Sequence, residues 1–265
     1  MKRVLEIIGL ALFLVSCEKE LDFQYHEVES QLVIEGFSSC EGTSVILTST
    51  CPMGEPMDIT PITDATVKLT DLTTGIEKML VANKDGIFSD ITPGFVGHDY
   101  KVDVSYKNNT YVSTCAMLPA TQILGLQFQW IKMPYDYVAV LQISFFDFDS
   151  EDDCYWIKIY RNGEPYMWLL SDDRSAVNGI INEVTMTSRM NVDEEDEKSV
   201  LKEGDEIKVV IVPTSRNMHD YLIAIQSDSN GPRMFSGDFC LGYYMASNET
   251  ESSIIFHPDS MEIFN

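Results

Sequence analysis

The chain has 265 residues and a formal net charge of −24 at pH 7. Its length allows one large β domain or two smaller ones, each able to bury a core of its own. A surface this acidic repels nucleic acid and anionic membrane surfaces, so we expect no nucleic-acid partner. The charge is typical of a solvated surface, and the alternative is attraction for cations or basic partners.

The first residues have the order of a secretory signal peptide. Lys2 and Arg3 give a positive start, and residues 7–15 form an apolar run that ends in a small residue and Cys17. A membrane-spanning helix would need about 20 apolar residues. The Leu-Val-Ser-Cys sequence is the pattern that bacterial lipoprotein processing recognises, with cleavage before the cysteine and acylation after it. We therefore predict a signal peptide over residues 1–16 and a lipid anchor on Cys17, with the bilayer as its partner. The alternative is a plain signal peptide with a chance cysteine.

Residues 17–27 are polar and acidic, and predict a tether that leads into a series of short strands. Runs with alternating apolar and polar residues, separated by Gly, Pro and Asn, are typical of such strands. They lie at residues 31–37, 44–49, 65–71, 78–82, 87–88, 100–106 and 110–117. No helical run separates them, so we predict an antiparallel β-sandwich over residues 28–118.

A domain boundary is predicted at residues 119–122, and residues 119–265 form a second β-rich domain with longer strands. These strands lie at residues 123–131, 137–148, 154–160, 166–170, 207–212, 241–246 and 253–256. Between residues 171 and 202 the pattern weakens, and the charge run at 193–197 predicts a solvated loop. One helix is expected near residues 215–227, capped by Thr214 or Ser215, because Met218, Leu222 and Ile225 fall on one apolar stripe.

The cysteines favour no metal centre. Once Cys17 is acylated, five cysteines remain, and an odd number leaves at least one thiol free or paired between chains. Cys40 and Cys51 flank a turn-rich segment and could close a small loop. No Cys-x-x-Cys sequence is present, which argues against zinc. Cys115 and Cys154 lie in strand-like runs, so we expect them to be buried and unpaired.

Two groups of residues are candidate sites. Between two predicted strands lie five carboxylates that can supply oxygen ligands to calcium, and the alternative is a solvated loop; they are Asp147, Asp149, Glu151, Asp152 and Asp153. Tyr135 and Tyr137 lie in a turn beside Pro134, where core packing makes the least demand on them. We predict them as exposed aromatic residues that bind a ligand by stacking on sugar rings or by docking a partner protein.

The sequence contains no motif for catalysis. The four histidines are scattered, and no Gly-x-Ser-x-Gly, His-Glu-x-x-His or phosphate loop is present. We therefore predict a protein that is not an enzyme and has no cofactor, apart from the calcium alternative.

Short motifs in a fixed order carry a family resemblance. They lie at residues 32–36 (Leu-Val-Ile-Glu-Gly), 65–71 (Ala-Thr-Val-x-Leu-x-Asp), 85–88, 100–102, 153–159 (Asp-Cys-Tyr-Trp-Ile-x-Ile), 203–209 (Glu-Gly-Asp-x-Ile-x-Val) and 241–247 (Leu-Gly-Tyr-Tyr-x-Ala-Ser). Together with the Cys17 motif, this order resembles the Bacteroidota outer-membrane lipoprotein family known as domain of unknown function 4249. Residues 65–104 alone also resemble the carboxypeptidase-regulatory-like sandwich. The family's Asn- and Gly-rich stretch is only approximated here, by residues 230–233 and 237–238.

The resemblance implies a mainly β protein, with an immunoglobulin-like N-terminal sandwich followed by a second β-rich domain. It implies an outer-membrane lipoprotein that is encoded beside TonB-dependent transporters, and the acidic tether resembles a surface-export signal. The alternative for the tether is an ordinary flexible linker. We therefore predict a non-enzymatic, lipid-anchored cell-surface protein that binds a ligand or acts as an accessory subunit of TonB-dependent nutrient uptake. The alternatives are a structural or adhesive surface module and an extracellular hydrolase.

Overall fold

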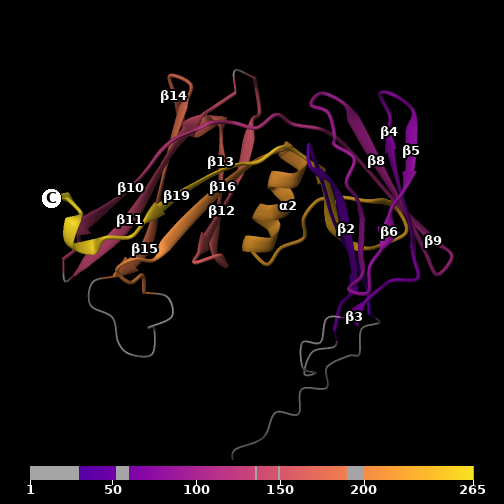
Figure 1. Ribbon diagram of the computed structural model, residues 1–265, viewed down its shortest axis with the longest axis horizontal. Coiled ribbons are helices and arrows are strands. Elements are labelled where there is room, and N and C mark those ends of the chain that lie inside the picture. The colour runs from indigo at the N-terminus through magenta and orange to yellow at the C-terminus, as the bar shows by residue number, and fades with distance from the viewer. Residues whose placement is uncertain (1–29, 52–59, 135, 149, 190–199, 265) are drawn as a thin grey trace, which may run out of the picture. The chain divides into compact units, whose positions relative to one another are not determined.

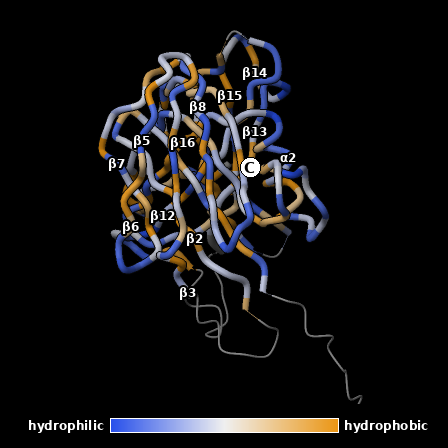
Figure 2. The backbone as a smooth tube through the Cα atoms, turned by 90° about the vertical axis from the view of Figure 1, so that its right-hand side faces the viewer, coloured by the Kyte–Doolittle hydropathy of each residue, from blue (hydrophilic) through white to orange (hydrophobic). Residues whose placement is uncertain are grey.

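Four β-sheets, arranged in two sandwiches, carry most of the chain (Figure 1). The computed structural model describes residues 30–51, 60–134, 136–148, 150–189 and 200–264. Within this part, residues 31–50 and 60–264 belong to one compact unit. Alternating apolar and polar residues turn one face of each strand into a core, and Figure 2 shows orange stretches interrupted by blue and white ones along the strands.

The first sandwich consists of two sheets. One has the strand order β18-β1-β2-β7-β6, with β3 paired to β2, and the other has the order β17-β9-β8-β4-β5. The strands of the first of these sheets are β1 (Leu32–Ser39), β2 (Gly42–Ser49), β3 (Thr60–Pro61), β6 (Val81–Ala82), β7 (Ile87–Asp90) and β18 (Leu241–Ala246). Those of the second are β4 (Thr66–Asp71), β5 (Ile76–Met79), β8 (Asp99–Tyr106), β9 (Asn109–Ala116) and β17 (Ser236–Gly237). Ile34, Val45, Val67 and Val102 are fully buried between the two sheets.

The second sandwich pairs the sheets β14-β15-β11-β10-β20 and β13-β12-β16-β19. The strands of the first are β10 (Ile123–Lys132), β11 (Tyr137–Phe146), β14 (Ala176–Val177), β15 (Ile180–Arg189) and β20 (Ile263–Phe264). Those of the second are β12 (Cys154–Arg161), β13 (Glu164–Asp172), β16 (Glu206–Thr214) and β19 (Thr250–Ile255). Leu141, Ile143, Ile157 and Ile211 are fully buried in its core.

The single α-helix of the described residues is α2 (Arg216–Gln226). The Ser215 side chain accepts a hydrogen bond from Met218 N–H and caps the helix, which decides between the two predicted caps. Met218 and Leu222 face the sheet and pack with Val210 and Val212 of β16. The predicted mainly β fold, with a sandwich, a second β-rich part and one short helix, is confirmed.

The sheet pairing departs from the predicted division at residues 118 and 119. β17 and β18 follow α2 in sequence, yet β17 pairs with β9 and β18 pairs in parallel with β1, so both extend the first sandwich. In Figure 1 the yellow chain accordingly lies beside the indigo strands. Gly36 in β1 makes this approach possible, because a Cβ there would lie 2.7 Å from Tyr244 Cδ2.

Three local expectations also differ from the structure. The predicted strand at 78–82 changes sheets at the buried Leu80, so β5 and β6 belong to opposite sheets. The sequence does not predict β15, because several of its residues are polar and its apolar residues Val184 and Met186 are exposed. Cys40 and Cys51 lie beyond opposite ends of the eight-residue β2, and no disulfide joins them. About 3.3 Å per strand residue keeps them too far apart for a disulfide.

A candidate binding groove between two strand edges

Three of the predicted site residues, Cys17, Tyr135 and Asp149, lie outside the described residues. Tyr137 begins β11, where its half-buried side chain packs against the second core. Its ring is therefore less open than the turn position predicts.

The remaining carboxylates of the predicted calcium cluster point to separate partners. Asp147 accepts a hydrogen bond from the Tyr155 hydroxyl at 2.8 Å, and burial raises the pKa of Asp147. Asp153 accepts one from the Ser150 hydroxyl at 2.6 Å. Among the residues that the structure describes, no group of three or more His, Cys, Asp or Glu side chains could hold a metal ion.

A guanidinium group lies beside this loop, and sequence reasoning did not foresee it. Arg216, at the start of α2, approaches Asp152 and Asp172 at 3.4 Å each and Asp173 at 3.7 Å. Asp172 is also bound by Arg174, and hydrogen bonds from Arg174 lower the pKa of Asp172. The acidic loop is thereby tied to the helix by ion pairs.

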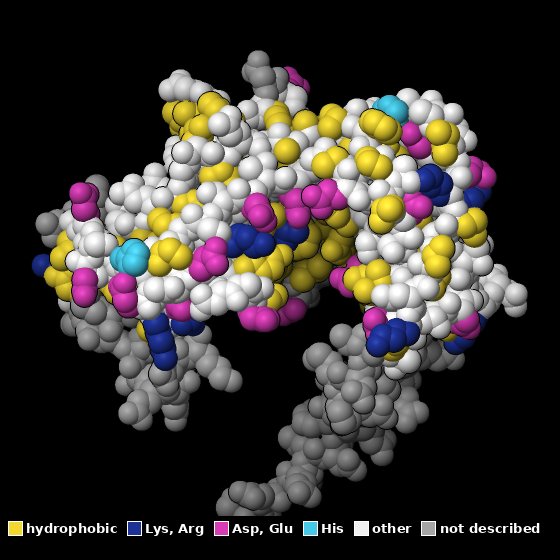
Figure 3. Space-filling view, in the orientation of Figure 1, with side chains coloured by type: hydrophobic (Ala, Val, Ile, Leu, Met, Phe, Trp, Pro, Cys, Tyr) yellow, Lys and Arg dark blue, Asp and Glu magenta, His cyan; other side chains and the backbone are white. Residues whose placement is uncertain are grey.

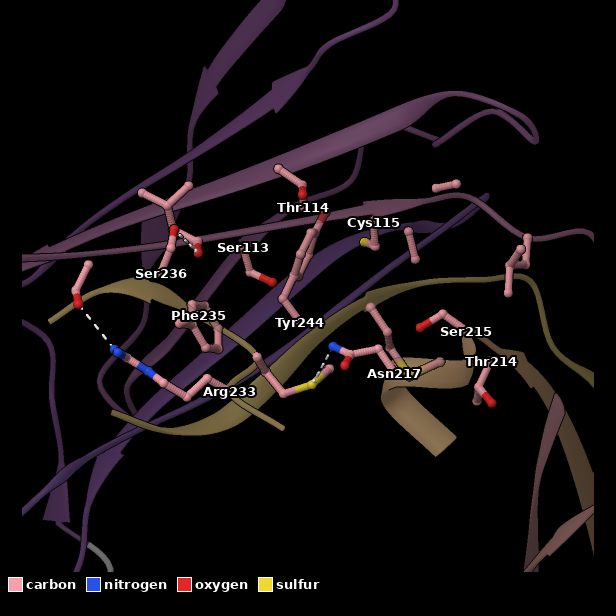
Figure 4. Close-up of a pocket in the computed structure, with 17 residues that line it drawn as sticks. Ser113, Thr114, Cys115, Thr214, Ser215, Asn217, Arg233, Phe235, Ser236 and Tyr244 are labelled. Carbon is pink, nitrogen blue, oxygen red and sulfur yellow. Dashed lines mark hydrogen bonds between the residues drawn. The ribbon is translucent and has the colours of Figure 1, made fainter. Parts of the chain in front are cut away.

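A hollow with a volume of about 740 Å³ lies elsewhere, where β9 and β18 separate (Figure 4). We call it the β9–β18 groove. Its 17 lining residues come from β9 and the residues just after it, the end of β16, the start of α2, the segment before β17, β17 and β18. They are Val112, Ser113, Thr114, Cys115, Ala116, Leu118, Thr214, Ser215, Asn217, Arg233, Met234, Phe235, Ser236, Gly237, Tyr244, Met245 and Ala246. A volume of this size is in the range of roughly 300–1,000 Å³ that small-molecule sites occupy.

Two sheet edges form the groove. β9 and β18 are neighbours at the edges of opposite sheets in the first sandwich. They are joined at one end, where Leu118 N–H donates to Ala246 O at 3.1 Å and Asn248 N–H donates to Leu118 O at 3.0 Å. Away from this bridge the two strands are unpaired with each other, and the groove opens between them.

Residues 233–237 also line the groove, next to the short pairing of β17 with β9. β17 pairs with β9 only at Tyr111 and Val112. Phe235, the preceding residue, turns into the first core and is only 4 % exposed. Figure 4 shows Arg233 and Ser236 at one end of the groove, and Ser215 and Asn217 at the other.

The groove is electrostatically distinct from the rest of the chain. Arg233 is the only charged side chain among its lining residues, and its Nη2 donates to Gly237 O at 3.0 Å and Asp238 O at 3.1 Å. Figure 3 shows magenta acidic side chains spread singly and in small groups over the face in view. The groove therefore combines one positive group with an uncharged lining in a chain of net charge −24.

The chemistry of the lining favours binding. None of the lining residues is His, Asp, Glu or Lys. Cys115 carries the one thiol of the lining, and burial raises its pKa to about 12, despite hydrogen bonds with Tyr244 and Ala246. Such a thiol is protonated at neutral pH and is a poor nucleophile. The hydroxyl, amide and backbone groups can hold a ligand by hydrogen bonds.

No helix within the described residues has the length and the apolar character needed to cross a membrane.

Comparison with known proteins relates nearly the whole chain to one family. Residues 18–253 match the family described as "Domain of unknown function (DUF4249)". The comparison with curated proteins found no match. Among solved structures, a two-fibronectin type-III domain segment from chicken tenascin is similar over 86 % of this chain and 100 % of its own, with 10 % identity and a TM-score of 0.26. A chain of a cytokine receptor complex covers 84 % of this chain and 95 % of its own, with 9 % identity and a TM-score of 0.26.

Proposed function

The chain belongs to the DUF4249 family, and we propose that it is a non-enzymatic lipoprotein of the bacterial outer membrane that binds its ligand in the β9–β18 groove. In this proposal, acylated Cys17 anchors the protein at the cell surface of a member of the Bacteroidota. The folded body serves a TonB-dependent transporter as a ligand-binding or accessory subunit.

The observation that carries the binding role is the composition of the groove. It combines a volume of about 740 Å³ with hydroxyl, amide and apolar side chains and a single guanidinium. General acid–base catalysis needs a titratable group placed beside the substrate, and the lining offers only a high-pKa thiol, the buried Tyr244 phenol and the arginine. The groove is therefore suited to holding a ligand rather than to transforming it.

The signal sequence supports the anchoring role. Two or more acyl chains hold a protein stably on a bilayer, because each buried methylene adds about 0.8 kcal/mol. We expect the full-length protein to fractionate with outer membranes, and Cys17→Ala to move it to the soluble fraction. Mass spectrometry of the native N-terminus should show an acylated Cys17. Membrane retention of the Cys17→Ala variant, or an unmodified Cys17 in native material, would contradict the anchor.

Isolation of the intact lipoprotein tests the transport role. In mild detergent, we expect a TonB-dependent transporter to copurify in a fixed ratio with the lipoprotein. Cross-linking in intact cells should give the same pair. A lipoprotein that is purified in full yield without a transporter, from cells that express both, would leave the groove as a binding site but remove the transport role.

A further inference from the structure

We propose that the β9–β18 groove binds an extended polypeptide, which pairs as an additional strand with the open edge of β9 and places a carboxylate near its C-terminal end against Arg233. This inference rests on the proposed binding role of the groove and names the class of ligand.

Two hydrogen bonds identify which backbone groups of β9 face the groove side. Asp238 N–H donates to Thr110 O, and the Ser236 hydroxyl donates to Val112 O, both at 3.1 Å. Alternate residues of a strand turn their backbone groups to the same edge. Thr114 and Ala116 therefore direct their N–H and C=O groups outward, while Ser113 and Cys115 bond to β8.

This edge is open over the length of the groove. β8 pairs with β9 along its inner edge, and β17 covers the outer edge only at Tyr111 and Val112. Within the described residues, no strand pairs with the outer edge over residues 113–116. All four of these residues line the groove, as expected for a strand that is approached from its edge rather than from one face.

The path of the chain before β17 explains the gap. In the antiparallel register Ser236 lies opposite Val112, so a longer β17 would place residues 233–235 opposite 113–115. Phe235 is instead buried in the first core, and Met234 packs against the first and third cores. The position beside residues 113–115 of β9, in line with β17, is thus not filled by residues 233–235. It lies within the groove.

Backbone geometry selects the class of occupant. Outward groups on alternate residues repeat about every 6.6–6.8 Å, which a second β-strand matches with its own N–H and C=O groups. Extended peptides are recognised in this way at exposed sheet edges, where the backbone supplies affinity and side-chain pockets supply specificity. The apolar side chains of Val112, Met234 and Met245 offer such contacts.

The position of Arg233 orients the peptide. A strand antiparallel to β9 and in line with β17 has its C-terminal end beside β17. The Arg233 guanidinium lies at this end, since it donates to Gly237 O and Asp238 O. A guanidinium binds a carboxylate by charge-assisted hydrogen bonds, so an Asp or Glu side chain, or the terminal carboxylate, is favoured there.

A displayed library of random twelve-residue peptides is the probe, selected against the mature lipidated chain in lipid nanodiscs. The selected peptides, synthesised with a fluorescent label, are then titrated by fluorescence anisotropy. We expect Thr114→Pro to weaken binding at least tenfold, because it removes an outward N–H. Thr114→Val changes the same side chain but keeps the N–H, and should bind within about twofold of wild type. Proline is tolerated on an edge strand when its nitrogen faces away from the ladder, so Thr114→Pro should remain folded.

Hydrogen exchange of the wild-type protein gives a second readout that needs no variant. Bound peptide should slow the exchange of the Thr114 and Ala116 amides.

Arg233→Gln should weaken the binding of acidic peptides, and the D-enantiomer of a selected peptide should fail to bind. Equal binding to Thr114→Pro and Thr114→Val, unchanged exchange at both amides, or no peptide enriched above empty nanodiscs would overturn the inference. The Cys17→Ala fractionation and the transporter copurification are independent of these outcomes, so failure of the proposed function is distinguishable.

Discussion

Asp205 holds several polar partners at the start of β16. Its carboxylate accepts hydrogen bonds from Lys202 N–H at 2.7 Å and Asn162 Nδ2 at 2.8 Å, and pairs with Arg161 Nη2 at 2.6 Å. Burial raises the pKa of Asp205, but these partners outweigh burial, and the net pKa is lowered. The residue thereby joins the start of β16 to the β12–β13 hairpin, which is a structural role.

We predict that Asp205→Asn lowers the free energy of unfolding by about 3 kcal/mol at pH 7, since it leaves the largely buried Arg161 without its carboxylate. A lowered folded pKa stabilises the protein above the unfolded pKa, and this contribution is lost as the pH falls through the folded value. The difference from wild type should therefore shrink below about pH 4. Urea unfolding at pH 7, 4 and 3 measures it. Glu251→Gln, at the exposed Lys208–Glu251 pair, is the control and should change stability by less than about 0.5 kcal/mol.

His219 makes the free energy of unfolding depend on pH in a higher pH range than Asp205 does. The side chain is only 4 % exposed, and its Nδ1 has no hydrogen-bond partner among the described residues. Burial lowers the pKa of His219 from 6.5, and the Arg216 charge lowers it further, while Asp172 and Asp220 oppose both. The folded protein thus holds His219 neutral in a range where the unfolded chain binds a proton.

We predict that stability falls as the pH drops from 7.5 to 5, because protonation of His219 in the unfolded chain favours unfolding. His219→Gln should remove this part of the slope. Urea unfolding midpoints at half-unit pH steps compare the two proteins. The carboxylates with lowered pKa contribute mainly below this range, so equal slopes for wild type and His219→Gln between pH 7.5 and 5 would contradict the assignment.

At the scale of elements, the attachment of β18 to β1 depends on a glycine. Gly242 has φ +100°, and a Cβ at this position would lie 2.0 Å from Ile34 O. The backbones of β18 and β1 approach too closely there for any side chain. The glycine of the Leu-Gly-Tyr-Tyr sequence at residues 241–244 is therefore required by the close approach of the two backbones.

We predict that Gly242→Ala destabilises the protein by more than about 4 kcal/mol, since it adds a backbone clash to the cost of a positive φ. Gly163 is the matched control, because its φ is +86° and an added Cβ would have nothing within 4 Å. Gly163→Ala should cost only about 1–2 kcal/mol. Urea unfolding of the two variants separates strain from clash, and similar losses in both would contradict the close approach of the two strands.

Local sequence patterns predict those strands that have one apolar, buried face and one polar, exposed face. β8 reads Asp-Tyr-Lys-Val-Asp-Val-Ser-Tyr, and its buried residues are Tyr100, Val102 and Val104, as the alternation predicts. β15 escapes this reasoning because Val184 and Met186 are exposed while Thr187 is buried. The register of β15 with β11 in the same sheet, rather than the polarity of its own residues, decides which of its side chains turn to the core.

At the scale of the whole molecule, the groove cannot be predicted from the sequence. It predicts strands at 110–117 and 241–246. Neither sequence pattern indicates that these two strands, more than 120 residues apart in the chain, lie side by side in the fold. Their meeting depends on the parallel pairing of β18 with β1, which is a contact between distant parts of the chain. The groove follows from this pairing and from the burial of Phe235, so it is visible only in three dimensions.

The return of β18 also decides whether the first sandwich can fold alone. Phe235, Tyr244 and Ala246 belong to its core and are at most 4 % exposed. The Tyr244 hydroxyl is 2.8 Å from the Ser38 hydroxyl, which also lies 2.7 Å from Thr43. A chain that ends at residue 118 would open a cavity in this core and leave the edge of β1 unpaired.

We therefore predict that a fragment of residues 28–118 lacks a cooperative thermal transition, because loss of two buried aromatic side chains costs about 3–5 kcal/mol each, comparable to the stability of a small domain. Appending residues 229–248 through a flexible Gly/Ser linker should restore cooperative unfolding, and appending the same segment with Tyr244→Ala should not. Circular dichroism melts and amide proton dispersion compare the three chains. Cooperative unfolding of the bare fragment would place the domain boundary at residue 118 after all, and the β9–β18 groove would then belong to a segment that docks on a finished domain.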